Sequence, residues 1–143
     1  MNGDQDFLRA LVVEDEALIA MHLGGLLEEM GLDVVGPFAR AELALDRLQH
    51  MAPDVAVLDV NLGSGGTSFP VARALIGAGV PFVFLTGYGQ AGVRDEFPGV
   101  PVLTKPVNEI ELGLMITKLL QAAASDGASD GAPDGPTDGK VMR

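Results

Sequence analysis

Short apolar runs alternate with amphipathic stretches along most of the chain. Most of the runs lack the apolar/polar alternation of a strand with one solvated face, which is typical of strands buried on both faces of a parallel sheet. Five such runs predict strands at residues 10–13, 34–35, 55–58, 82–85 and 100–103. Helices are therefore expected on both sides of one sheet.

The stretches between the runs predict these helices. Apolar residues recur at helical spacing from Ile19 to Met30, and Gly31 follows as a C-terminal stop. Further helices are expected from Leu43 to Met51 and over 69–78, 90–96 and 107–124. Because the helix at 90–96 is short and interrupted by glycine, we expect it to be the most mobile one.

Strands and helices that alternate five times predict an α/β fold with a doubly wound parallel sheet. Right-handed crossovers in a chain this short favour the flavodoxin-like strand order 2-1-3-4-5. The domain is expected to span residues 8–124, after a flexible N-terminus at 1–7. Residues 125–143 repeat Asp-Gly and have almost no apolar side chain, so a disordered tail is expected there.

Composition excludes several classes of function. The formal net charge of −11 over 143 residues argues against nucleic acid or an anionic membrane as a partner, because both attract clustered Lys and Arg. No cysteine is present, which rules out disulfides and thiolate metal sites. The N-terminus does not resemble a signal peptide, and no apolar run is long enough to cross a bilayer. We expect a cytoplasmic protein.

Polar side chains follow four of the predicted strands, at the point where each strand ends. Glu14 and Asp15 follow the first strand, Asp59 the third, Thr86 the fourth and Lys105 the fifth. Ligands of such folds bind beyond the carboxyl ends of the strands, where the strand order reverses. The first and third strands flank that position, so their three carboxylates should lie close together.

Close carboxylates repel unless a cation neutralises them, and a cluster of oxygen ligands without His or Cys favours Mg²⁺ over Zn²⁺. Mg²⁺ keeps several waters and leaves positions for phosphate, which is typical of phosphoryl transfer. Asp59 is the expected nucleophile, forming an aspartyl phosphate. Asp15 is the expected direct metal ligand, Glu14 a ligand through water or a side chain that orients the direct ligands, and the backbone carbonyl of Asn61 a further ligand.

Two more side chains complete the expected site. Lys105 would pair with the phosphoryl oxygens, and Thr86 would offer them its hydroxyl. Each residue taken alone has a simpler interpretation: carboxylates after strands often cap the next helix, lysine is usually a surface charge, and threonine is a common strand residue. Their joint position at one sheet edge favours the site.

The motifs VVEDE, VLDVNL, LTGYG and LTKP, in this order, resemble the receiver domains of two-component response regulators, of the chemotaxis-type single-domain kind. The resemblance implies Mg²⁺, a phosphoryl group taken from a histidine kinase or a histidine phosphotransfer protein, and no enzymatic activity of the chain itself. It also implies that Glu14 and Asp15 are the acidic pair, Asp59 the phosphoacceptor and Lys105 the phosphate-binding lysine.

The stretch VPFVFLTGYG resembles the PFxFATGY branch of alphaproteobacterial receivers, which is often paired with HWE-type histidine kinases, although Leu85 replaces the branch's alanine. Thr86 matches the family's switch hydroxyl, and Pro106 matches a proline that usually follows a cis peptide bond. Val102 stands where most receivers have a switching aromatic residue. Tyr88, in a glycine-flanked loop, is an alternative switch residue, and a partly buried loop tyrosine is an equal interpretation.

A monomeric single-domain regulator is therefore expected, which signals by phosphorylation-dependent protein binding or acts as a phosphate shuttle or sink. One alternative is a receiver-like scaffold that takes no phosphate. Another is a phosphatase of the haloacid-dehalogenase type, whose DxD motif resembles Asp59-Val60-Asn61. Asn61 lacks the second carboxylate that serves as general acid and base in that class, which makes the phosphatase the weakest alternative.

Overall fold

The computed structural model describes residues 7–87 and 92–131, with side chains up to Ser125. Five parallel strands form one sheet in the order β2-β1-β3-β4-β5. In chain order the elements are β1 (Arg9–Val13), α1 (Ala17–Glu29), β2 (Asp33–Phe38), α2 (Ala41–Leu48), β3 (Val55–Asp59), the 3-10 turn η1 (Gly63–Gly65), α3 (Phe69–Ala78), β4 (Phe82–Thr86), α4 (Val93–Glu96), β5 (Val102–Thr104) and α5 (Glu109–Gly131).

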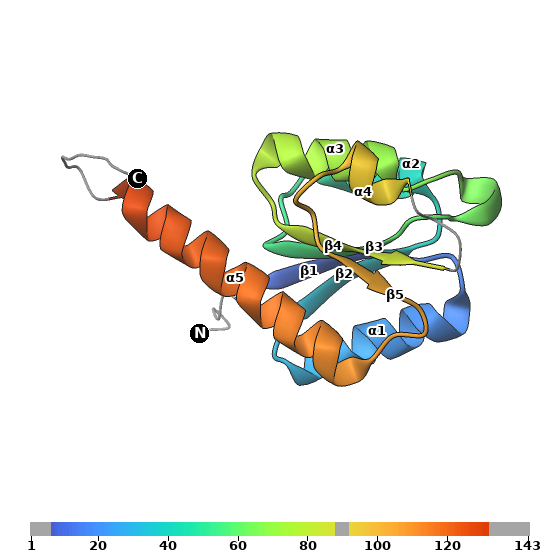
Figure 1. Cartoon of the computed structure of the whole chain (residues 1–143), viewed down its shortest axis with the longest axis horizontal. Coiled ribbons are helices and arrows are strands. Elements are labelled where there is room, and N and C mark those ends of the chain that lie inside the picture. The colour runs from blue at the N-terminus through green and yellow to red at the C-terminus, as the bar shows by residue number, and fades with distance from the viewer. Residues whose placement is uncertain (1–6, 88–91, 132–143) are drawn as a thin grey trace.

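Helices cover both faces of this sheet, as Figure 1 shows: α2, α3 and α4 lie on one side, and α1 and α5 on the other. Alternate residues of each central strand enter separate cores. In β1, Leu11 and Val13 pack on the α2/α3/α4 side, whereas Ala10 and Val12 pack on the α1/α5 side. Burial on both faces explains the uninterrupted apolar runs, and the predicted flavodoxin-like fold and strand order are confirmed.

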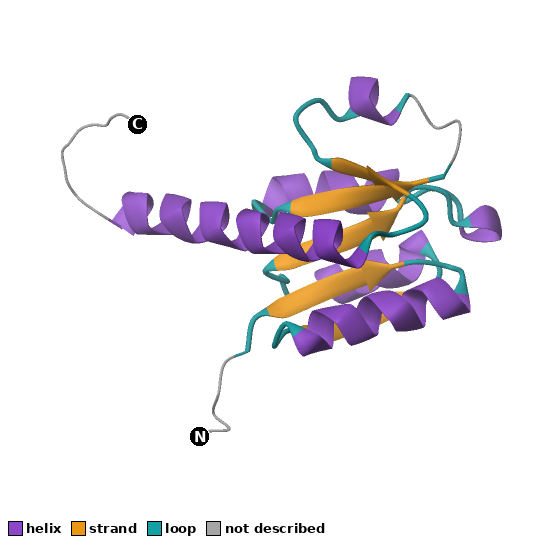
Figure 2. Cartoon of the chain, turned by 60° about the horizontal axis from the view of Figure 1, so that its bottom comes forward, coloured by secondary structure: helices purple, strands orange, loops and turns teal. Residues whose placement is uncertain are grey.

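Strand pairing brings the carboxyl ends of β1, β3 and β4 to one edge. Val13 lies opposite Leu58 in the β1/β3 ladder, and Asp59 lies opposite Leu85 in the β3/β4 ladder. The arrowheads in Figure 2 point to this edge, from which the loops to α1 and α3 emerge. Residues that follow these strands in sequence therefore meet in space.

Several elements differ from their predicted bounds; β2, for example, spans Asp33–Phe38 rather than 34–35. Strand β5 begins at Val102 rather than at Val100, because the amide of Val100 donates to the carbonyl of Phe97 at 3.2 Å in a turn. Helix α2 begins at Ala41 and ends before Met51; its buried residues are small alanines, while Leu43 is 48% exposed. The helix predicted over 90–96 is described from Val93 onward, and residues 88–91 lie outside the described part.

Helix α5 corrects the prediction for the tail. It continues through Gly131, past the predicted end at residue 124, so residues 125–131 are helical rather than disordered. Alanines at 122–124 have the highest helix propensity, and extending an existing helix by one residue costs far less than nucleating one. The first proline after this helix is Pro133, and the residue before a proline disfavours helix, so an end near Gly131 is expected.

The far end of α5 extends past the sheet (Figure 1). Within the described part of the chain, no helix combines the length and the apolarity that a membrane span requires. The predicted flexible N-terminus at 1–7 and the remainder of the predicted tail, 132–143, lie outside the described residues except for Phe7.

Candidate functional site

Three carboxylates meet at the edge where β1 and β3 end. Glu14, Asp15 and Asp59 each place an oxygen within 4.8 Å of the others. Glu14 and Asp59 are buried, at 2% and 4% exposure, whereas Asp15 faces solvent. Two carboxyl groups held out of water beside a third are costly without a cation, so the arrangement requires positive charge.

Lys105 supplies one such charge. Its Nζ lies 3.0 Å from Glu14 Oε1 and 3.2 Å from Asp59 Oδ2. The lysine is positioned by the end of β5, where its amide donates to the Thr86 carbonyl at 2.8 Å. The Lys105–Pro106 peptide bond is cis, as the family resemblance implied. One ammonium group thus bridges two buried carboxylates from different strands.

The protonation of Asp59 reflects these neighbours. Burial first, and then the negative charge of Glu14, raise the pKa of Asp59 to about 7, although Lys105 acts in the opposite direction. Burial lowers the pKa of Lys105, but its hydrogen bond to Glu14 and the charges of Asp59 and Glu14 outweigh burial and raise that pKa above its usual value. The protein alone leaves the carboxylates only partly neutralised.

An open pocket of about 370 Å³ lies over the cluster. Its lining residues are Asp15, Glu16, Asp59, Asn61, Gly63, Gly87 and Lys105. Gly63 has φ +61°, a conformation that disfavours side chains, and a Cβ there would approach Asp15 Oδ2 to 3.3 Å. The glycine-rich loop after β3 can therefore lie close to Asp15, and Asp59 is reachable through the pocket.

Sequence reasoning assigned no role to Glu16. Its Oε1 lies 3.8 Å from Lys105 Nζ, and it lines the pocket although its side chain is 63% exposed. The only indication in the sequence was that Glu16 is the third acidic residue of the motif VVEDE. The helix-capping interpretation does not hold for the acidic residues before α1: the N-cap residue is Glu16, no side chain caps the first turn, and Glu14 Oε2 instead accepts the amide of Glu16 at 3.0 Å. Glu14 thus contacts the residue before α1 and also belongs to the acidic cluster.

The remaining predicted residues are placed as follows. Thr86 is buried at the end of β4, opposite Thr104 of β5, beside the pocket-lining Gly87. The side-chain oxygen of Asn61 accepts the amide of Gly63 at 2.9 Å, which fixes the loop after β3. Val102 packs against the core on the α2/α3/α4 side. Tyr88 lies outside the described residues.

The donor set fits a hard divalent cation. Carboxylate oxygens of Glu14, Asp15 and Asp59 converge. Asn61 lies on the wall of the same pocket. Oxygen ligands at an open site match the preference of Mg²⁺, which retains waters and accepts phosphate oxygens. The metal role of the Asn61 carbonyl stays a prediction.

Comparison with known proteins agrees with this fold. The model of the response regulator receiver domain family matches residues 10–117. An uncharacterized response regulatory protein of Vibrio vulnificus is 32% identical over 120 residues, which are 82% of this chain and 49% of that protein. The chain spans about half the length of the curated relatives that it matches.

Solved structures give the same result. The receiver domain of the response regulator PhyR from Erythrobacter litoralis is 27% identical, with a TM-score of 0.72 over 80% of this chain and 90% of that one. SdrG from Sphingomonas melonis is 39% identical, with a TM-score of 0.68 over 85% of this chain and 99% of that one. The chain belongs to the response regulator receiver domain family of two-component signalling.

Proposed function

We propose that this receiver accepts a phosphoryl group on Asp59 in a Mg²⁺-dependent reaction and signals through phosphorylation-dependent protein binding or as a phosphate shuttle. The observation that carries the proposal is the position of Asp59: a buried carboxylate at the bottom of an open pocket, 3.2 Å from Lys105 Nζ and grouped with Glu14 and Asp15. The donor is a phosphorylated histidine of a kinase, with the HWE type as the first candidate, or of a phosphotransfer protein.

In the proposed reaction a carboxylate oxygen of Asp59 attacks the phosphorus of phosphohistidine. The new O–P bond forms as the P–N bond breaks, and the electron pair returns to the imidazole, which takes a proton from solvent. Lys105 leaves its ion pair with Asp59 and holds a phosphoryl oxygen instead. Thr86 donates its hydroxyl to another phosphoryl oxygen.

Only ionised Asp59 can attack, and its pKa of about 7 leaves a large neutral fraction at neutral pH. Mg²⁺ held by Glu14, Asp15 and Asp59, with the Asn61 carbonyl as a further ligand, would supply the charge that keeps Asp59 ionised and neutralises the transferred group. The metal requirement of the proposal thus follows from the electrostatics of the cluster.

Phosphorylation with acetyl phosphate or a phosphorylated histidine kinase tests this proposal. Wild-type protein with Mg²⁺ should gain one phosphoryl group in intact-mass spectra, and Asp59→Asn should gain none. Asp33→Asn is the matched control, because Asp33 is exposed at the start of β2, opposite Arg9 and at the other end of the sheet. Equal labelling of Asp59→Asn, or undiminished labelling of wild type in a chelator, would refute the assignment.

A further inference from the structure

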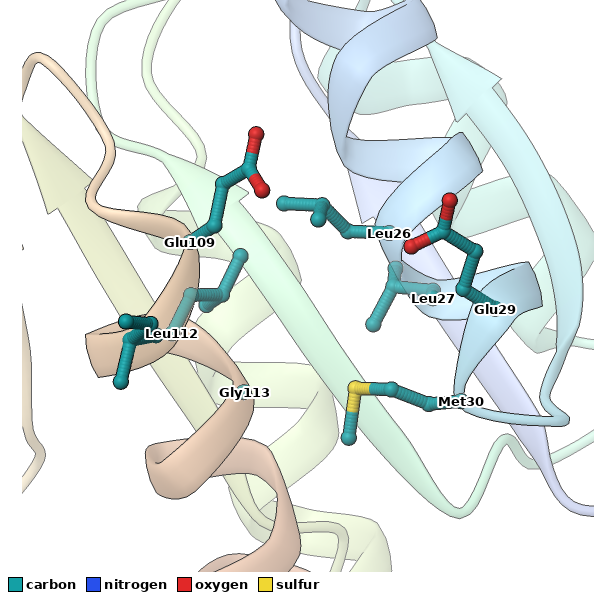
Figure 3. Close-up of a pocket in the computed structure, with 8 residues that line it drawn as sticks. Leu26, Leu27, Glu29, Met30, Glu109, Leu112 and Gly113 are labelled. Atoms are coloured by element: carbon teal, nitrogen blue, oxygen red, sulfur yellow. The ribbon is translucent and has the colours of Figure 1, made fainter.

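A second hollow lies between α1 and α5, and it shares no lining residue with the pocket over Asp59. Its volume is about 320 Å³, and its apolar walls come from Leu26, Leu27 and Met30 of the α1 side and from Ile110 and Leu112 of α5. Figure 3 shows Leu26, Leu27 and Met30 on the α1 side of the gap, opposite the part of α5 that carries Leu112 and Gly113. Ile110 is 76% exposed, so a large apolar side chain faces solvent at this hollow.

The hollow continues along α5. A neighbouring one, also of about 320 Å³, shares Met30 and is lined by Leu8, Leu32, Leu120 and Ala124. On α5 the lining positions 110, 113, 117, 120 and 124 recur every three or four residues, which places them on one helix face. The two hollows share Met30 and lie along one face of α5 between residues 109 and 124; together they are called the α1/α5 groove below.

Acidic side chains flank one end of this groove. Glu29 from α1 and Glu109 from α5 both line it, and Figure 3 shows their carboxylates on opposite sides of Leu26. Glu109 also contacts His22 Nε2 at 2.7 Å. Apolar walls between two carboxylates suit a short segment in which apolar side chains are flanked by cations.

The sequence contains one such segment outside the described part of the chain. From residue 121 onward, Lys140 and Arg143 are the only cations, and Val141 and Met142 are the only large aliphatic side chains. The order cation, apolar, apolar, cation is complementary to the groove. We propose that residues 140–143 dock in the α1/α5 groove of the same molecule, with Val141 and Met142 against the apolar walls and a flanking cation beside Glu29.

The length of the chain permits this contact. Helix α5 carries the chain about 27 Å beyond Gly113, at 1.5 Å per residue, before it ends at Gly131. The residues from 131 to 141, when extended, span up to about 33 Å. That reach covers the groove back to Gly113, and it covers the nearer hollow at Leu120 and Ala124 with slack.

A spin label tests the proposal on the full unphosphorylated chain, so its outcome is independent of the phosphorylation proposal. The sequence has no cysteine, and Gly139→Cys therefore accepts a single nitroxide beside the intact segment. In ¹⁵N-labelled protein, the amides of Met30, Gly113 and neighbouring groove residues should lose most of their signal. Amides of α2 and α3, on the opposite face of the sheet, should keep theirs.

Two comparisons make the result specific. Adding Val141→Asp and Met142→Asp to the spin-labelled protein should restore the groove signals while the spectrum stays that of a folded domain. Glu29→Gln should restore them in part, whereas Glu28→Gln, an exposed α1 glutamate that does not line the groove, should leave the losses unchanged.

The losses should persist when spin-labelled, ¹⁵N-labelled protein is mixed with an excess of plain protein, since the contact lies within one molecule. Intact signals at the groove would overturn the proposal, and so would losses spread evenly over the surface. Losses that disappear on mixing would also overturn it, because they would make a second copy of the chain the occupant.

Discussion

At the scale of single residues, the site depends on the balance between burial and charge around Asp59. Lys105 lies within 3.2 Å of it, yet the pKa of Asp59 still rises to about 7, because burial and Glu14 together outweigh one ammonium group. The protein groups alone therefore do not fully neutralise the negative charge of the carboxylate cluster. This deficit gives the cluster its expected affinity for a cation.

A pH dependence of stability follows for the protein in chelator. The native state holds a proton on Asp59 up to pH about 7, whereas the unfolded chain releases it near 3.8, so the native state binds more protons between these values. The stabilising contribution of Asp59 is complete below that window and is lost as the pH rises through it, by at most about 4 kcal/mol, since each pH unit of the window contributes about 1.4 kcal/mol. Urea unfolding from pH 4 to 8 measures the loss.

Asp59→Asn is the variant for this measurement, since an amide cannot ionise. It should flatten the decline of unfolding free energy between pH 4 and 7 and should be more stable than wild type at pH 8 in chelator. Asp33→Asn should retain the wild-type slope, because the pKa shift belongs to the buried cluster. A slope in Asp59→Asn equal to that of wild type would contradict the raised pKa.

At the scale of elements, the loop after β3 is packed closely against the loop between β2 and α2. A Cβ on Gly65 would lie 2.8 Å from the backbone oxygen of Ala39 and 3.1 Å from the Cα of Arg40. Both neighbouring atoms belong to the backbone, so a side chain at position 65 could be accommodated only if the backbone of the other loop moved. The loop that lines the pocket over Asp59 thus depends on a residue without a side chain.

Gly65→Ala should therefore lower the free energy of unfolding by about 1–3 kcal/mol, the usual cost of overpacking. Gly77→Ala is the matched control: it lies in α3 with nothing within 4 Å of its Cβ position, and alanine favours helix over glycine by about 1 kcal/mol. Urea denaturation should give shifts of opposite sign. An unchanged or increased free energy of unfolding in Gly65→Ala would contradict the close contact between the two loops.

Aromatic rings attach the short helix α4 to the sheet and to α3. The ring of Phe97, just after α4, lies 5.0 Å from that of Phe69 and 5.2 Å from that of Phe84, and the Arg73 guanidinium lies 5.3 Å from its centroid. Arg73 also pairs with Glu96. A helix of four residues has little stability of its own, so these contacts hold it in place.

Phe97→Ala should cost about 3–5 kcal/mol of stability, since Phe97 is buried and the cavity persists in part. Glu96→Gln should cost under about 1 kcal/mol, because both partners of its ion pair with Arg73 are exposed. Chemical denaturation of the two variants measures the difference. Equal costs would mean that the ion pair, and not the ring cluster, anchors α4.

Much of the molecule was predictable at this scale, for a physical reason. Parallel strands buried on both faces leave continuous apolar runs, and their carboxyl ends share one edge, so the meeting of Asp15 and Asp59 followed from topology. Two predictions from local pattern failed. The spacing of apolar residues places Leu43 on the buried face of a helix, but its side chain is exposed. The Asp-Gly composition after residue 124 predicts disorder, but α5 continues to Gly131 because extending a helix costs little. The approach of Glu16 to Lys105 depends on side-chain reach between two loops, which spacing does not encode.

At the scale of the whole molecule, a cation at the acidic edge should stabilise the fold, because the ligands come from β1 and β3 and converge only in the native state. At a Mg²⁺ concentration 100 times the dissociation constant, the gain is about 2.7 kcal/mol. Asp15→Asn should reduce the gain, and Asp33→Asn should not. A thermal melt with and without Mg²⁺ measures the gain, and equal gains in both variants would contradict the site.

Mapping the modified residue tests the central claim most directly. The protein is phosphorylated with Mg²⁺, reduced with borohydride, which converts an aspartyl phosphate to homoserine, and analysed by peptide mass spectrometry. We predict homoserine at position 59 alone. Homoserine at another position, or an unmodified peptide around Asp59 in folded, phosphodonor-treated protein, would contradict the assignment of Asp59 as the phosphoacceptor.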